Sequence, residues 1–116
     1  MDTHANLVYV EDKDFAGTVL ASETPVIVDF WASWCGPCLR IAPLYERMSD
    51  DYKGKVLFAK VDVDANPEVP MRYGIQGIPT FIVFKGGKEV DKLVGADPNR
   101  LKSMIDKVAA QSGSKA

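Results

Sequence analysis

Short apolar runs alternate along this chain with polar segments that contain glycine or proline. Two of these runs, Val26–Trp31 and Val56–Val61, are rich in β-branched and aromatic residues and are apolar at nearly every position. A strand with one solvated face alternates between apolar and polar residues, whereas a strand covered on both faces does not. We therefore expect both runs to be interior strands of a sheet that has helices on each face.

Three further segments are predicted to be strands, because they are short, apolar and bounded by turn residues. They are Leu7–Val10, Pro79–Phe84 and Glu89–Val94. The glycine pair in Lys85-Gly86-Gly87-Lys88 predicts a tight hairpin turn between the last two. These two strands should therefore be antiparallel.

Apolar residues at helical spacing predict four helices. The first starts at Asp12 or Lys13 and reaches about Leu20, and the second has Pro37 in its first turn and stops before Lys53-Gly54. The third has Asn66 as its N-cap and Pro67 at its first position, and it stops at Gly74. The fourth starts at Asp97-Pro98. Strands separated by helices pair in parallel through crossovers. The predicted fold is α/β, with a central mixed sheet that has a parallel core and an antiparallel C-terminal hairpin. We expect residues 1–116 to form one domain, with frayed tails at 1–6 and 112–116 and fraying that starts at Gln111.

Composition and charge exclude several classes of protein. The 116 residues are 47% hydrophobic, which is enough for one globular core without cross-links. Fourteen basic and sixteen acidic residues, with no basic run, argue against nucleic-acid binding. The longest apolar run is too short to span a membrane, and the first residues lack the features of a secretory signal. We therefore expect a cytoplasmic protein in a reducing compartment, where a cysteine pair is more often functional than structural.

The two cysteines, Cys35 and Cys38, are three residues apart at the predicted start of a helix. Helical geometry places their Cα atoms about 5 Å apart, which suits a disulfide. The free N–H groups and the positive dipole at a helix N-terminus favour a thiolate on Cys35, whereas Cys38 lies one turn in and should be less exposed. An accessible nucleophile followed by a sheltered resolving thiol is the arrangement that thiol–disulfide exchange requires.

Other uses of the pair fit less well. A zinc site needs about four ligands, and the chain has only two cysteines and one histidine, so such a site would have to be shared between chains. Covalent haem attachment needs a histidine where Leu39 stands. A structural disulfide closing so small a loop would add only about 2 kcal/mol of stability. The carboxylates of Asp62 and Asp64 are too few for a metal and are explained by entry into the next helix.

The segment Val28–Ala32, the pentapeptide Trp34-Cys35-Gly36-Pro37-Cys38 and the segments Ile41–Pro43, Tyr73–Thr80 and Val94–Ala96 closely resemble the thioredoxin family. The resemblance extends from about Leu7 to Ala110 and implies that family's fold. It also implies a protein-disulfide reductase in which Cys35 attacks the target disulfide and Cys38 resolves the mixed disulfide. No bound cofactor is implied. The implied partners are disulfide-containing target proteins and an external reductase, linked to NADPH or ferredoxin, and we expect a monomer.

Asp29 interrupts an apolar strand, which argues against the solvent-facing position usual for aspartate. A buried carboxyl has a raised pKa suited to proton transfer, and the resemblance implies that Asp29 assists deprotonation of Cys38. Lys60 on its own is predicted to be a surface lysine, but the resemblance places it near Asp29. The bond before Pro79 is expected to be trans from general frequencies alone. The resemblance instead implies a cis proline, beside which the main chain of Ile78 receives a substrate strand.

The resemblance further implies a flat apolar surface around Cys35, at which target proteins bind. Its residues are Trp34, Gly36, Pro37, Gly77, Ile78, Gly95 and Ala96. We expect Trp34 to be exposed, because Trp31 better suits the buried face of its strand. In one departure, Leu39 follows the second cysteine where the family commonly has lysine, and Arg40 comes next, so we expect the electrostatics of reductase and target recognition, rather than the chemistry, to differ.

Two other functions remain open at this stage. Oxidases and isomerases with this fold typically carry a histidine between the cysteines, where Gly36-Pro37 provides no charge. A less stabilised thiolate makes a stronger reductant, which favours the reductase. A non-catalytic docking subunit or redox sensor is the third hypothesis, and no residue requires it.

Overall fold

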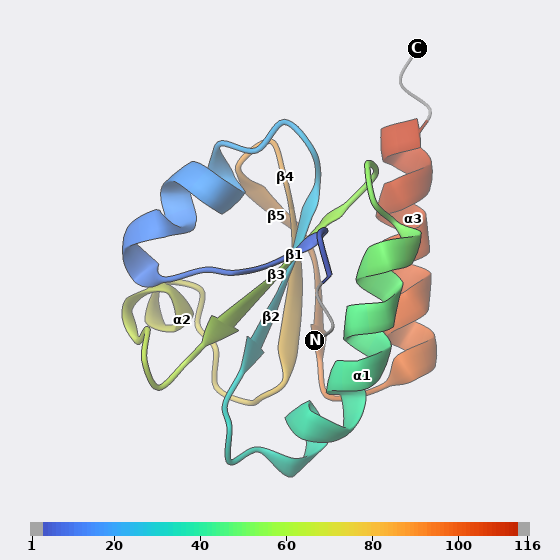
Figure 1. Ribbon diagram of the computed structural model, residues 1–116. Helices are drawn as coiled ribbons and strands as arrows, with labels where there is room; N and C mark the ends of the chain where they lie inside the picture. The colour runs from blue at the N-terminus through green and yellow to red at the C-terminus, as the bar shows by residue number, and fades with distance from the viewer. Residues whose placement is uncertain (1–3, 114–116) are drawn as a thin grey trace.

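A five-stranded mixed sheet forms the centre of the molecule in the computed structural model, which describes residues 4–113, and side chains through residue 111 (Figure 1). The strands are β1 (Leu7–Tyr9), β2 (Val26–Trp31), β3 (Leu57–Asp62), β4 (Thr80–Lys85) and β5 (Lys88–Val94), in the order β1-β3-β2-β4-β5. The pairs of β3 with β1 and β2 are parallel, and the pairs of β4 with β2 and β5 are antiparallel. This mixed sheet confirms the predicted fold class.

Helices cover both faces of the sheet. The helices α1 (Gly36–Asp51) and α3 (Pro98–Gly113) lie side by side on one face, and α2 (Glu68–Arg72) lies with the helical segment 12–20 on the other (Figure 1). Within the described residues, no helix is both long enough and apolar enough to cross a bilayer.

The two interior strands are buried as their sequence predicts. Residues 26–30 of β2 and 58–61 of β3 are buried. Successive side chains of β2 alternate between faces, so that Ile27 packs in the core beneath α1 and α3 while Val28 packs on the opposite side. The buried hydroxyl of Tyr45 donates to the carbonyl oxygens of Ile27 (3.0 Å) and Ala59 (2.8 Å), and these bonds fix α1 across β2 and β3.

The helix predicted from Asp12 to Leu20 is not a regular α-helix. It consists of a 3₁₀ turn, Asp12–Asp14, and a π-helical turn, Ala16–Leu20, closed by a hydrogen bond from the N–H of Ala21 to the carbonyl of Ala16. Glycine and β-branched residues are poor α-helix formers, and this short segment contains Gly17 and Val19. Packing of Phe15 and Val19 into the core therefore determines its path.

The N-cap predicted for α2 is wrong in the side chain that accepts the hydrogen bonds of the helix start. The carboxylate of Asp12, rather than Asn66, accepts hydrogen bonds from the N–H groups of Glu68 (3.0 Å) and Val69 (2.9 Å). The side chain of Asn66 instead accepts from the N–H of Asp12 at 2.9 Å. Three hydrogen bonds therefore join Asp12 to the start of α2 and to the loop before it.

The predicted tails also differ from the structure where it describes them. Asn6 is buried and its amide donates to the carbonyls of Ser49 (2.8 Å) and Val56 (2.7 Å), which ties residues before β1 to the end of α1. At the other end, α3 continues through residues 111–113, which were expected to fray. The remaining tail residues, 1–3 and 114–116, lie outside the described residues.

Candidate active site at the start of α1

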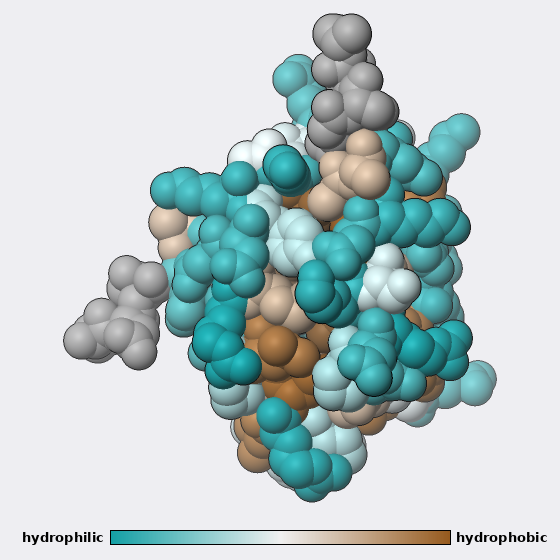
Figure 2. All heavy atoms as spheres, turned by 90° about the vertical axis from the view of Figure 1, so that its right-hand side faces the viewer, coloured by the Kyte–Doolittle hydropathy of each residue, from teal (hydrophilic) through white to brown (hydrophobic). Residues whose placement is uncertain are grey.

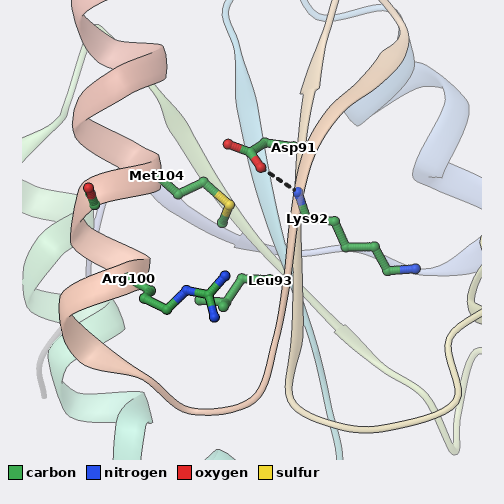
Figure 3. Close-up of a pocket in the computed structure, with 6 residues that line it drawn as sticks. Asp91, Lys92, Leu93, Arg100 and Met104 are labelled. Carbon is green, nitrogen blue, oxygen red and sulfur yellow. Dashed lines mark hydrogen bonds between the residues drawn. The ribbon is translucent and has the colours of Figure 1, made fainter.

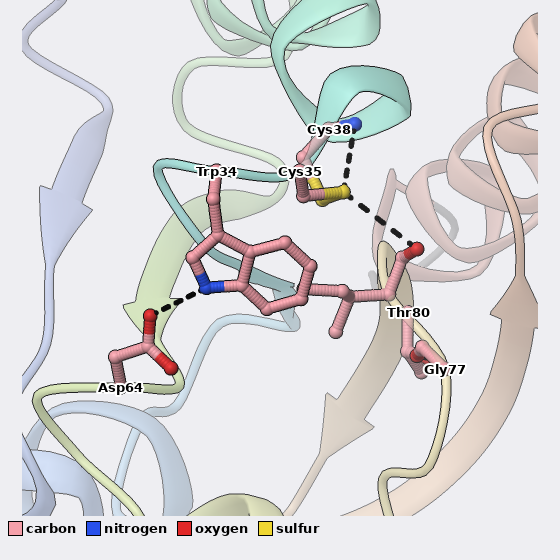
Figure 4. The surroundings of a disulfide bond; sticks show 7 residues. Trp34, Cys35, Cys38, Asp64, Gly77 and Thr80 are labelled. Carbon is pink, nitrogen blue, oxygen red and sulfur yellow. Dashed lines mark hydrogen bonds between the residues drawn. A yellow bond between two sulfur atoms is a disulfide. The ribbon is translucent and has the colours of Figure 1, made fainter.

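The cysteine pair occupies the junction between β2 and α1. Cys35 is the N-cap residue of α1, with extended backbone angles (φ −88°, ψ 108°), and its sulfur accepts a hydrogen bond from the N–H of Cys38 at 3.2 Å. The two residues form a disulfide with their Cα atoms 5.2 Å apart, in agreement with the predicted spacing (Figure 4). One sulfur thus performs the capping that a serine or aspartate oxygen usually provides.

Cys38 is slightly less exposed than Cys35, as predicted, but the predicted accessibility of Cys35 is not found in this disulfide-bonded form. Cys35 retains 4% of its surface and Cys38 retains 2%. Both cysteines pack at the helix end with Ala32 and the half-buried Ile78. The asymmetry lies in hydrogen bonding, because only the Cys35 sulfur receives a helix N–H.

A second loop contacts the disulfide from the opposite side. The Cys35 sulfur lies 3.8 Å from the carbonyl oxygen of Ile78, and the Ile78–Pro79 bond is cis, as the resemblance implied. The carbonyl of Pro79 accepts from the N–H of Gly95 at 2.8 Å. Gly95 has a φ of 107°, which only glycine adopts readily, so the turn after β5 needs glycine there. The turn after β5 is therefore bonded to the loop that contacts the disulfide.

Trp34 stands beside the disulfide and is 69% exposed, as predicted. Its indole N–H donates to the carboxylate of Asp64 at 2.7 Å (Figure 4). The carboxylate of Asp62 in turn accepts from the N–H of Asp64 at 2.9 Å and holds that turn. Helix entry, the role predicted for these two acids, does not account for the bond from Trp34 to Asp64, which joins residues thirty positions apart.

Asp29 is fully buried in β2, on the face that packs against α1. Neither of its oxygens makes a hydrogen bond with the described residues. Burial raises the pKa of Asp29 from its ordinary value of 3.8 to about 7, and the nearby Lys60 opposes that rise only in part. A carboxyl with this pKa exchanges its proton readily at neutral pH.

Lys60 is the neighbour of Asp29 across the β2–β3 pair and is only 4% exposed, so the prediction from its residue type alone is wrong. Its ammonium lies 4.7 Å from the centre of a Trp31 ring and 5.7 Å from that of Tyr9. Two aromatic faces thus hold a buried cation that forms no ion pair within 4 Å among the described residues. The contribution of Tyr9, on the edge strand β1, was not foreseen.

The other residues of the predicted binding surface lie at the same end of the sheet. Gly36, Pro37, Gly77 and Ala96 are exposed, Ile78 and Gly95 are half-buried, and Pro79 is buried. Two exposed apolar residues beyond the prediction are Val94 (61%) and Leu39 (50%). A Cβ on Gly77 would lie 3.7 Å from the Val94 side chain, which places β5 against the loop before Pro79.

Cavities elsewhere offer less chemistry. A pocket between β5 and α3 is lined by Asp91, Lys92, Leu93, Arg100, Ser103 and Met104. The Lys92 side chain points away from Arg100 and Met104 (Figure 3). The charged groups of this pocket therefore do not converge on one position. Among residues 4–113, no group of three or more histidine, cysteine or acidic side chains is arranged to hold a metal.

A mixed sheet with a disulfide at the N-terminus of its first long helix, opposite a cis proline, defines a dithiol–disulfide oxidoreductase. Comparison with known proteins agrees with this class. A sequence model of the thioredoxin family matches residues 6–107. A thioredoxin from Chlorobaculum thiosulfatiphilum is 52% identical over 96 residues, covering 83% of this chain and 86% of that protein. A chloroplastic M-type thioredoxin from Zea mays is 45% identical over 107 residues, covering 91% of this chain and 64% of that protein.

A solved structure of a Malassezia sympodialis thioredoxin matches this fold with a TM-score of 0.83 at 39% identity, covering 89% of this chain and 90% of that one. The chain belongs to the thioredoxin family. Its redox group is its own disulfide rather than a bound cofactor, and family and cysteine pair together make it a protein-disulfide reductase.

The buried carboxyl of Asp29 gives the first prediction, on stability. Between about pH 4 and pH 7 the folded state holds a proton on Asp29 that the unfolded state releases, so its effect is to lower stability as pH rises through this range. In the oxidised protein, Asp29→Asn should match wild type near pH 4 and be more stable by about 4 kcal/mol near pH 8. Urea unfolding at both pH values measures the difference.

Asp51→Asn, at an exposed position of α1, is the matched control and should leave the pH dependence unchanged. An equal effect of Asp29→Asn at both pH values would show that the carboxyl does not titrate in this range.

Proposed function

We propose that this chain reduces disulfides in other proteins through a mixed disulfide on Cys35. The Cys35 thiolate attacks one sulfur of the target disulfide, and the other target sulfur leaves as a thiolate. The Cys38 thiolate then attacks the Cys35 sulfur and releases the second target thiolate. The target gains two electrons, and the chain is left with the Cys35–Cys38 disulfide. The observation that carries this assignment is the hydrogen bond from the helix N–H of Cys38 to the Cys35 sulfur, since such a bond stabilises a thiolate there.

Asp29 is proposed to take the proton from the Cys38 thiol before the second step. Its position supports this role, because its side chain faces α1, which buries Cys38 on the same side of the sheet. Its pKa of about 7 lets it accept the proton near neutral pH and lose it again. The cation of Lys60 is proposed to stabilise the carboxylate form of Asp29, because it lowers the pKa of Asp29 below the value that burial alone would produce.

The target chain is proposed to bind in an extended form across the surface defined by Trp34, Gly36, Pro37, Gly77, Ile78, Pro79, Gly95 and Ala96. The main chain of Ile78 lies next to the reacting sulfur and supports pairing with a substrate strand. Specificity at this surface is then low, because main-chain hydrogen bonds and small apolar residues accept many sequences.

An external reductase, linked to NADPH or ferredoxin, is proposed to restore the dithiol, with disulfide-containing proteins as the other partners. We further propose that the chain acts as a monomer, since every residue of the site comes from one copy. A cytoplasmic location is proposed because a dithiol reductant needs a reducing compartment. Sedimentation of the purified chain tests the monomer, and fractionation of its host cells tests the location.

The order of attack is tested by trapping the mixed disulfide. Cys38→Ser should accumulate a covalent adduct with a disulfide-bonded peptide, because the resolving thiol is missing. Cys35→Ser should form no adduct, because Cys38 lies inside the first turn of α1. Intact mass after acid quenching measures both. An adduct that forms on Cys38 in the Cys35→Ser variant would reverse the assignment.

The role of Asp29 is tested by the pH dependence of the second step. Asp29→Asn should slow release of the reduced peptide about tenfold near pH 7. This loss is smaller than the usual effect of removing a general base, because a fraction of the Cys38 thiol ionises without help. The deficit should disappear near pH 9. Rapid-quench measurement of the mixed disulfide gives the rate, with Asp51→Asn as control. The same deficit at every pH would indicate a structural effect instead.

A further inference from the structure

The side chain of Arg40 reaches back along α1 to Gly36, which lies between the two cysteines. It follows Gly36 by four residues on α1, so both lie on the same side of the helix. Its guanidinium folds back toward the helix start, with Nη1 3.3 Å from the position that a Cβ on Gly36 would occupy. The side chain is exposed and enters none of the ion pairs found among the described residues. An unpaired cation therefore borders the cysteine motif.

Helix stability does not account for this position. The N-terminus of a helix carries the positive end of the dipole, where a cation is unfavourable. The guanidinium nevertheless points toward that end and meets no carboxylate there. Its charge is thus available to a group that arrives from outside the chain.

An apolar pocket of about 280 Å³ adjoins Arg40 between α1 and the start of α3. It is lined by Arg40, Ile41, Leu44, Ala96 and Pro98. Figure 2, which views the side of the molecule with α1 and α3, shows hydrophobic atoms gathered in a hollow in the lower half of this face. Ala96 also belongs to the proposed binding surface, and Gly95 before it is bonded to Pro79. The pocket therefore continues that surface away from the disulfide.

We propose that Arg40 and this pocket form a specificity subsite for target segments that carry a carboxylate and an apolar side chain beside their disulfide. The inference rests on the proposed function and adds a substrate preference to it. The guanidinium pairs with the carboxylate, a geometry that arginine favours through two parallel hydrogen bonds. The apolar side chain enters the pocket, where Arg40 is the one charged residue among the described residues that line it. Arg40 is thus a specificity-determining residue.

The test uses three disulfide-bonded peptides that differ at one position next to the disulfide, which carries Glu, Gln or Lys, each followed by Leu. Wild type should reduce them in the order Glu, Gln, Lys, with kcat/KM falling about threefold per step at low salt. The differences should vanish near 1 M salt. Arg40→Gln should remove the differences in kcat/KM among the three peptides, and Arg40→Glu should reverse their order. Exchanging Leu for Gly in the Glu peptide should cost wild type about fivefold.

Arg47→Gln, an exposed arginine further along α1, is the matched control and should keep the wild-type order. If Arg40→Gln changed kcat/KM for all three peptides by the same factor, the cation would act on the Cys35 thiolate and the subsite would be refuted. An order that survives in Arg40→Gln, or an exchange of Leu for Gly without effect, would also overturn the proposal. If wild type failed to reduce the uncharged Gln peptide, the proposed function itself would be wrong.

Discussion

The hydrogen bond that caps α1 with the Cys35 sulfur is the interaction on which the site depends. It requires the helix to begin one residue after Cys35, and the two bonds from the Tyr45 hydroxyl hold that helix across β2 and β3. With α1 fixed in this way, Cys35 meets the carbonyl of Ile78 on the neighbouring loop. Capping, sheet packing and loop contact thus converge on one sulfur atom. The same N–H that stabilises the helix start also favours the thiolate that attacks a target.

Asp29 shows where function and stability diverge. A carboxyl with no hydrogen bond in the core costs free energy whenever it is ionised, and the cation of Lys60 is held by aromatic rings rather than paired directly with it. A core designed only for stability would place an apolar residue there. The unfavourable environment is what moves the pKa of this carboxyl to about 7, so the cost and the proposed proton transfer have the same origin.

Local patterns in the sequence were sufficient for much of this structure. The unbroken apolar runs of β2 and β3 predicted interior strands, and the spacing of Cys35 and Cys38 predicted a disulfide at a helix start. Contacts between distant segments carried no such pattern: Asp12 caps α2, and Asp64 binds Trp34. The fold-back of Arg40 depends on side-chain conformation, which helical spacing permits but does not determine. The cis bond before Pro79 and the nearness of Lys60 to Asp29 followed only from the family resemblance, and the burial of Lys60 was not predicted.

The most direct test of the account is the reduction potential of the Cys35–Cys38 pair. The chain would be equilibrated in a series of thiol–disulfide buffers at pH 7, and its free thiols counted by alkylation and mass. A protein-disulfide reductase with no charged residue between its cysteines should have a potential well below that of the cytosolic glutathione pool. A potential at or above that of the pool would contradict the account and would indicate an oxidase or isomerase, with Arg40 stabilising the Cys35 thiolate.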